Sequence, residues 1–271
     1  SDGTSFDCGQ ILITVITVVF NAEKYISRCI SSVQSQTHKN IEHIIIDGQS
    51  TDGTVELIKR MDLSGTTVIS EPDSGIYNAM NKGLKLASGS FIAFLNADDY
   101  WEPQALEVLL SSALDNDVPI AYASMLFFDE NNVAILKDEA RPWSDAILIE
   151  GVPGGHETFL IAAHCFEFLN GFDESFKLAG DYDFICRCYL AGFKAVGIPQ
   201  TLLCMASGGQ SFSERLEFDE NKNVLDNIYG KVTEEDFKFV YGLKYYKNWG
   251  GYEYHPGYVE DRLLSIAEKN P

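Results

Sequence analysis

Phe91-Ile92-Ala93-Phe94-Leu95-Asn96-Ala97-Asp98-Asp99 is an apolar run that ends in an amide and two adjacent carboxylates. The five apolar residues predict a buried strand, and in an open α/β sheet ligands bind at the carboxyl ends of strands. Two neighbouring carboxylates repel each other unless a cation or a hydrogen-bond donor neutralises them, and oxygen ligands suit Mg²⁺ or Mn²⁺. The same residues also fit an acidic turn in which Asp99 caps a helix near Pro103.

Strand-like and helix-like segments alternate through the first hundred residues. Apolar, mostly β-branched runs predict strands at residues 11–20, 41–46, 67–70 and 91–95. Apolar residues at helical spacing predict helices between them, at residues 21–36, 55–61 and 76–86. This alternation predicts an α/β fold of right-handed βαβ units, with a mostly parallel central sheet and flanking helices.

The pattern changes after residue 101. We expect helices at residues 105–114 and 181–190, a hairpin formed by 120–128 and 133–136, and short strands at 195–198 and 202–205. Beyond residue 212 the chain is charged and helix-like, then aromatic from 237 to 258. The sequence therefore predicts a disordered leader (1–9), one α/β domain (10–212) and a helical, aromatic-rich C-terminal extension (213–271).

The 271-residue chain carries a formal net charge of −20. This argues against a nucleic-acid partner and against electrostatic docking on anionic lipid, because both attract basic surfaces. A phosphorylated small substrate is still compatible, since a metal ion can invert the field inside one cleft. The six cysteines form no CxxC pair, which argues against zinc and favours a reducing compartment. With no apolar run of bilayer length, we expect a cytoplasmic protein, either free or peripheral to the inner face of the membrane.

Carboxylates recur at the ends of successive predicted strands. Asp47 follows the second strand, Asp73 the third and Asp98 the fourth. Because these ends lie on one edge of a parallel sheet, the three acids are expected to converge on one crevice. A single strand-end aspartate is usually a helix cap, but three in succession favour a ligand site.

Four segments carry a more specific signal: ITVVFNAE (16–23), IIIDGQSTDGT (44–54), SEPDSGIYNAMNKG (70–83) and LNADD (95–99). In this order they resemble the nucleotide-binding half of the GT-A, family 2 inverting glycosyltransferases, and the resemblance spans roughly residues 11–212. It implies a GT-A (Rossmann-like) fold and a role in polysaccharide biosynthesis. The implied enzyme uses Mn²⁺ or Mg²⁺ to move a hexosyl or N-acetylhexosaminyl group from a nucleotide-diphosphate sugar, most plausibly UDP-linked, to a hydroxyl of a glycan or lipid-linked saccharide.

The resemblance also implies roles for individual residues. Asp47 resembles the acid that binds a uracil-type base, and Asp98 the ligand of a metal bridging both donor phosphates, with Asp99 in support. Asn96 stands where an aspartate is common and can still hydrogen-bond a ribose hydroxyl. The remaining donor-side residues are Val19, Asn21, Glu23, Asp73, Tyr77, Asn81 and Ala97, of which Asn81 also fits an ordinary helix surface.

Inversion requires a general base. The resemblance places this base in a second acidic motif, which corresponds to residues 178–184. Asp181 resembles that general base, and Gly180 replaces the usual glutamate; Asp181 also fits a helix N-cap, and Asp183 a structural partner of Arg187. His156 and Glu157 resemble the acceptor or donor-sugar side, where Glu157 replaces a common glutamine. Residues 207–211 resemble a loop over the donor phosphates, although a plain surface loop fits equally well.

Two other functions compete with this interpretation. A sugar-1-phosphate nucleotidyltransferase also places metal carboxylates on an α/β sheet, but residues 18–25 lack its glycine-rich, basic loop. A non-catalytic nucleotide-sugar-binding relative is the other alternative, although the presence of both Asp98 and Asp181 argues against it. The aromatic C-terminal extension fits packing on the domain, an acceptor groove or a homo-oligomer contact.

Overall fold

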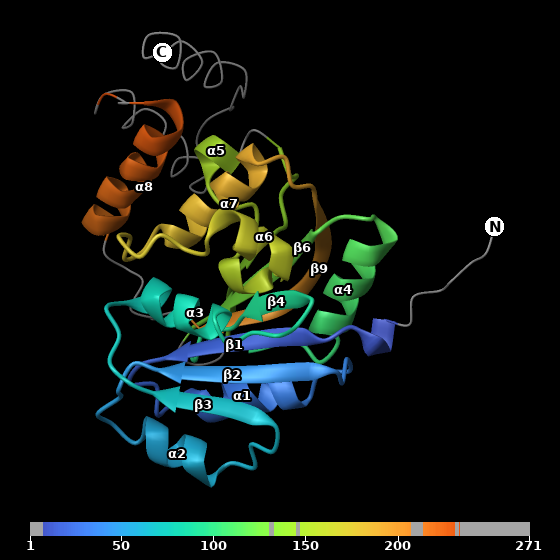
Figure 1. Cartoon of the computed structure of the whole chain (residues 1–271), viewed down its shortest axis with the longest axis vertical. Helices are drawn as coiled ribbons and strands as arrows, with labels where there is room; N and C mark the ends of the chain where they lie inside the picture. The colour runs from blue at the N-terminus through green and yellow to red at the C-terminus, as the bar shows by residue number, and fades with distance from the viewer. Residues whose placement is uncertain (1–7, 130–132, 145–146, 207–213, 231–232, 234–271) are drawn as a thin grey trace, which may run out of the picture.

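The computed structural model describes residues 8–129, 133–144, 147–206, 214–230 and 233 (Figure 1). Within these residues one sheet of nine strands runs through the molecule, in the order β3-β2-β1-β4-β8-β6-β9-β5, with β7 paired to β6. Helices lie around the sheet, and α8 lies beside the upper part of the molecule near α7 (Figure 1). None of the helices in this described part is long and apolar enough to cross a membrane.

The first half of the sheet is parallel, as predicted. Its strands are β1 (Ile13–Val19), β2 (Ile41–Asp47), β3 (Thr66–Ser70) and β4 (Phe91–Phe94). The crossover helices are α1 (Ile26–Gln34), α2 (Thr54–Arg60) and α3 (Ile76–Leu84). The register places Val19 opposite Asp47, and Asp47 opposite Ser70. The strand-end residues therefore lie side by side on one edge.

The second half of the sheet is mixed. Its strands are β5 (Tyr100–Trp101), β6 (Ile120–Phe128), β7 (Ala134–Asp138), β8 (Leu160–Ala162) and β9 (Ala195–Ala206). Its helices are α4 (Ala105–Asp115), α5 (Ile147–Glu150), α6 (Ala163–Leu169), α7 (Gly180–Leu190) and α8 (Glu214–Tyr229), with short 3-10 turns η1 (Cys8–Gln10) and η2 (His156–Thr158). Strand β8 is antiparallel to β4 and β6, whereas β6 and β9 are parallel.

Both faces of the parallel half are covered, because alternate side chains of a strand point to opposite faces. Ile45 packs with Ile30 of α1 and Ile58 of α2 in one apolar cluster. Ile44 and Ile46 belong to the larger cluster that includes residues of α3 and the second half of the sheet. This two-sided burial explains why the strands are continuous apolar runs.

The structure corrects several predicted element boundaries. The first helix begins at Ile26 rather than residue 21, because Asn21 has φ 50° and residues 22–25 form a turn. The two strands predicted at 195–198 and 202–205 form one strand, β9, whose register shifts around Pro199. Proline cannot donate to a ladder, which accounts for the apparent gap. The three-residue β8 and the helix α6 were not predicted.

The predicted chain ends are only partly described. Cys8 and Gly9, placed in a disordered leader by the sequence, belong to η1 instead. Residues 1–7 lie outside the described residues, as does the aromatic segment from 237 to 258. The expected helical start of the C-terminal extension is present as α8, which inserts the buried Val224 and Leu225 into the molecule.

Candidate functional site

The end of β2 is fixed by Asp47, whose side chain is fully buried. Its carboxylate accepts hydrogen bonds from Ser50 Oγ and Ser70 Oγ, both at 2.5 Å, and from Ser50 N at 3.2 Å. Ser50 lies in the β2–α2 loop and Ser70 ends β3, so Asp47 ties neighbouring strand ends together. A direct contact of Asp47 with a nucleobase stays a prediction and would require these bonds to be exchanged.

The loop after β1 is held by the β2–α2 loop. Asn21 donates its N–H to Ser50 Oγ at 2.8 Å, and its Oδ1 accepts from Thr51 N at 2.8 Å. Glu23 Oε2 accepts from Gly53 N at 3.3 Å. Asn21 and Glu23 therefore shape the strand-end loop, and both remain exposed at that edge.

Phe20 is a residue that the sequence analysis did not single out. It is 52% exposed, although the preceding Val19 is buried. A Cβ at Gly48 would lie 2.4 Å from Asp73 Oδ2 and 3.5 Å from Phe20 Cδ2. Glycine thus lets the ends of β1 and β2 approach Asp73 closely. A large aromatic residue directly after a buried strand and before Asn21 was the available signal.

A turn before α3 forms the next wall of this edge. Asp73 Oδ1 accepts from Gly75 N at 3.0 Å, and Gly75 has φ 139°, a conformation that favours glycine. Lys177 Nζ donates to Ser74 O at 2.8 Å and so attaches this turn to the segment before α7. Tyr77, in the first turn of α3, is buried.

The loop after β4 presents Asn96 and Asp98. Asn96 Nδ2 donates to Glu157 Oε1 of η2, while Asn96 Oδ1 is buried and has no hydrogen-bond partner among the described residues. Asp99 N donates to Asn96 O at 3.1 Å, which closes the turn, and the Asp99 side chain is only 2% exposed. Ala97 is also buried, so Asp98 is the accessible carboxylate of the pair.

Arg28 is a cationic neighbour of Asp98. Arg28 Nη2 donates to Asp98 O at 2.9 Å, and its guanidinium lies 4.3 Å from the centre of the Tyr100 ring. Burial raises the pKa of Asp98, and the Arg28 charge opposes this shift. Within the described residues no group of three or more His, Cys, Asp or Glu side chains is arranged to hold a metal ion by itself.

Glu157, in η2, lies in the sequence between the acidic segment at 95–99 and the one at 178–184, and it is 4% exposed. Trp101 Nε1 donates to Glu157 O at 2.8 Å and fixes its backbone. Burial, reinforced by the charges of Asp181 and Asp98, raises the pKa of the Glu157 carboxyl. The charges of Asp98 and Asp181 therefore both act on Glu157, a grouping that the strand-end argument for Asp47, Asp73 and Asp98 did not predict.

Asp181 lies in the first turn of α7 and is positioned by Tyr77. The Tyr77 hydroxyl lies 3.1 Å from Asp181 Oδ1 and 2.7 Å from Leu178 O, so one phenol contacts both ends of this turn. Gly180 packs directly against the Tyr77 ring, where a Cβ would lie 2.7–2.8 Å from three ring carbons. Any side chain at position 180, including the family's glutamate, would displace that ring.

His156 completes the neighbourhood of Asp181. Its ring stacks on Phe94 with a centroid distance of 5.4 Å and meets Phe172 edge-on at 5.8 Å. Burial lowers the pKa of His156, and the charge of Asp181 opposes this shift. The neutral imidazole is therefore favoured at pH 7, with one side supported by aromatic rings.

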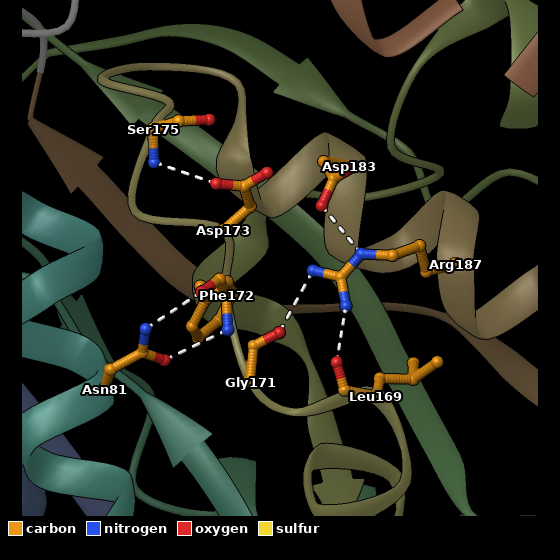
Figure 2. A network of polar contacts seen from close by, with 8 residues as sticks. All are labelled: Asn81, Leu169, Gly171, Phe172, Asp173, Ser175, Asp183 and Arg187. Carbon is orange, nitrogen blue, oxygen red and sulfur yellow. Dashed lines mark hydrogen bonds and ion pairs between the residues drawn. The ribbon is translucent and has the colours of Figure 1, made fainter. Parts of the chain in front are cut away.

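Asn81 is not brought to this cluster. Figure 2 shows its side-chain amide bonded to the backbone carbonyl oxygen and the backbone nitrogen of Phe172, with Nδ2 2.9 Å from Phe172 O and Oδ1 3.0 Å from Phe172 N.

The expected pair of Asp183 and Arg187 is present at 2.7 Å, and Arg187 also donates to Leu169 O and Gly171 O (Figure 2). A cavity of about 780 Å³ lies beside these residues, with Asn81 and Arg187 in its lining. The loop at 207–211 lies outside the described residues.

Comparison with known proteins identifies the family of the chain. Residues 14–185, more than half of the chain, match the family described as glycosyl transferase family 2. The chain belongs to glycosyl transferase family 2. It is similar to the Escherichia coli protein UDP-Glc:alpha-D-GlcNAc-diphosphoundecaprenol beta-1,3-glucosyltransferase WfgD, with 36% identity over 123 residues, 45% of this chain and 49% of that protein. The chain thus spans about half the length of this curated relative.

Two solved structures share the fold. One is S. aureus TarS 1-349 in complex with UDP-GlcNAc, with a TM-score of 0.65 and 17% identity, covering 85% of this chain and 70% of that chain. The other is the mannosyltransferase PcManGT from Pyrobaculum calidifontis in complex with GDP-Man and Mn2+, with a TM-score of 0.60 and 16% identity, covering 95% and 86%. The expected glycosyltransferase fold is therefore confirmed.

The contact between Gly180 and Tyr77 yields a stability prediction. We expect Gly180→Ala to lower the free energy of unfolding by about 1–3 kcal/mol, because overpacking a filled site forces its neighbours apart. Alanine is otherwise the better helix former, so helix propensity alone predicts the opposite sign. Urea unfolding measures the change. In a Tyr77→Leu background the same substitution should cost less, and an equal cost in both backgrounds would contradict the assigned contact.

The position of Glu157 yields a pH prediction. A carboxyl whose pKa is raised on folding binds its proton more tightly in the folded state, so stability falls as pH rises from about 4.5 to about 7. We expect Glu157→Gln, which keeps an oxygen acceptor for Asn96, to remove this loss of folding stability at higher pH. Melting temperatures in EDTA should show a larger advantage of the variant at pH 8 than at pH 5. An advantage that does not change with pH would contradict the assigned environment.

Proposed function

We propose that this protein is a metal-dependent inverting glycosyltransferase that moves a sugar from a nucleotide-diphosphate donor, UDP-linked, to a hydroxyl of a glycan or lipid-linked saccharide. The observation that carries this proposal is the convergence of Asp98, Glu157 and Asp181. These acids come from the β4 loop, η2 and α7, and the charges of Asp98 and Asp181 both act on Glu157. A site this acidic suits a substrate that brings cations with it.

The nucleotide side of the donor is assigned to the ends of β1, β2 and β3. Phe20 offers an exposed ring on which a base can stack. Asp73 and the turn at Gly75 lie beside it, and Asn21 and Glu23 supply exposed polar groups. Asp47 supports these residues indirectly: it accepts from Ser50, whose Oγ accepts from Asn21 N, and from Ser70 at the end of β3.

The metal is assigned to the β4 loop. Asp98 provides an accessible carboxylate, and the unpartnered Asn96 Oδ1 provides a second oxygen, which fits a hard cation. Asp99 supports the turn from its buried position. Bound Mn²⁺ or Mg²⁺ would stabilise the charge that develops on the leaving diphosphate. Because so few protein ligands are present, the donor phosphates have to complete the coordination.

The acceptor side is assigned to α7 and η2. Inversion at an anomeric carbon is an in-line displacement, so one base removes the proton of the acceptor hydroxyl. Asp181 takes this role, with Tyr77 holding one carboxylate oxygen and leaving the other free to accept the proton. His156, neutral at pH 7, and Glu157 face the reacting sugar from the neighbouring turn.

The names of related proteins support the substrate class. The Escherichia coli relative is named for UDP-Glc and a GlcNAc-diphosphoundecaprenol acceptor, and S. aureus TarS 1-349 was crystallised with UDP-GlcNAc. A lipid-linked acceptor would place this protein at the inner face of the membrane, and the C-terminal extension is the candidate for self-association. The main alternative is a binding relative without activity, for which no base would be needed at position 181.

A donor screen tests the proposal without knowledge of the acceptor. The full chain is incubated with UDP-glucose, UDP-GlcNAc, UDP-galactose and GDP-mannose, with Mn²⁺ or with EDTA. We expect Mn²⁺-dependent release of UDP from at least one UDP-sugar, because water replaces the acceptor slowly. Binding of UDP without hydrolysis or transfer would favour the non-catalytic alternative. Release of pyrophosphate from UTP and a sugar 1-phosphate would instead indicate a nucleotidyltransferase.

The base assignment makes a separate prediction. We expect Asp181→Asn to lower the rate of donor hydrolysis by about 10²-fold or more, because general base catalysis supplies that order of acceleration. The affinity for UDP with Mn²⁺ should stay within about two-fold, a small change in free energy. Asp115→Asn, which removes an exposed charge on α4, is the matched control. Unchanged hydrolysis in Asp181→Asn would show that the base is wrongly assigned.

A further inference from the structure

The segment that leads into α7 is held by a carboxylate from outside the family match. Glu220 belongs to α8 and is 6% exposed. Its Oε1 accepts from Lys177 N at 2.8 Å, and its Oε2 accepts from Leu178 N at 2.7 Å and Ala179 N at 2.9 Å. Three consecutive backbone N–H groups therefore converge on one buried side chain. Such a concave row of amides is an anion-binding arrangement, filled here by the protein itself.

This contact acts on the residues that carry the base. Leu178 donates its N–H to Glu220, and its carbonyl oxygen accepts from the Tyr77 hydroxyl. The same hydroxyl lies 3.1 Å from Asp181 Oδ1, so its single proton is shared between Leu178 O and the Asp181 carboxylate. The turn before Asp181 is thus clamped from both sides, by α8 on its N–H face and by α3 on its carbonyl face.

We infer that Glu220 is a positioning residue for Asp181, and that α8 is part of the catalytic unit although it lies beyond residues 14–185. This inference rests on the proposed function, since it concerns the placement of the proposed base. Glu220 does not touch the reacting atoms. It acts by fixing the backbone of residues 177–179, and reacting groups displaced by about 1 Å are known to lose about 10² in rate.

A purely structural role is the competing explanation. A buried carboxylate that accepts three N–H bonds also secures α8, and removing it leaves three unpaired donors. The two explanations predict different effects of removing the Glu220 carboxylate. A positioning role lowers the rate of the chemical step in a folded protein, whereas a structural role lowers stability and leaves the rate of the folded fraction unchanged.

The test compares Glu220→Ala and Glu220→Gln with Asp219→Asn, which removes the exposed neighbouring carboxylate of the same helix. Donor hydrolysis with Mn²⁺ is measured at saturating donor, below the melting temperature of each variant. We expect kcat to fall about 10²-fold in Glu220→Ala. Glu220→Gln, which keeps one acceptor oxygen, should recover part of that loss. The Kd for UDP should change by less than about three-fold, under 1 kcal/mol.

Hydrogen exchange supplies a readout that needs no activity. The amides of Leu178 and Ala179 should exchange slowly in the wild type and in Asp219→Asn, and fast in Glu220→Ala. A wild-type kcat in both Glu220 variants would overturn the inference, as would slow exchange in Glu220→Ala. If the wild type hydrolyses no donor, the proposed function fails by itself, and fast exchange in Glu220→Ala still supports the clamp.

Discussion

Electrostatic repulsion of the buried Glu157 carboxyl by the charges of Asp181 and Asp98 is the constraint on which the proposed site depends. The three acids reach one site from three separate segments, and burial strengthens the effect of each charge on the others. Folding tolerates this concentration of charge because the flanking structure is tightly fixed. Asp47 locks the strand ends, Asn96 donates to Glu157, and Tyr77 holds Asp181. In the function proposed here, a cation delivered with the donor phosphates would offset the remaining repulsion.

The departures from the common family pattern make sense as a connected set. Asn96 replaces a carboxylate, and its amide donates to Glu157, which itself replaces an amide. Relative to the pattern that the resemblance implies, the ionisable group of this pair therefore lies on η2 and the amide in the β4 loop. Gly180 replaces a glutamate, and the vacated space is filled by the Tyr77 ring that contacts Asp181.

Much of the fold could be predicted from the sequence because its signals are local. The apolar runs at β1, β2 and β4 are buried on both faces and read directly as parallel strands. The ordered motifs also predict Asp98 and Asp181 as site residues, from local sequence alone. By contrast, η2, β8 and the role of Glu220 depend on contacts between residues far apart in sequence, such as Glu220 with Leu178. The bond of Asn81 to Phe172 is another such long-range contact.

Calorimetric titration of UDP into the full chain, with Mn²⁺ and with EDTA, tests the central claim most directly. If the acid cluster is a site completed by a cation, Mn²⁺ should tighten UDP binding by about ten-fold or more, equivalent to about 1.4 kcal/mol. Titrations near pH 6.5 in buffers of different ionisation enthalpy should also show proton release, because the pKa of Glu157 is raised to about 7 without the cation. Equal affinity in Mn²⁺ and EDTA, with no proton release, would contradict the account.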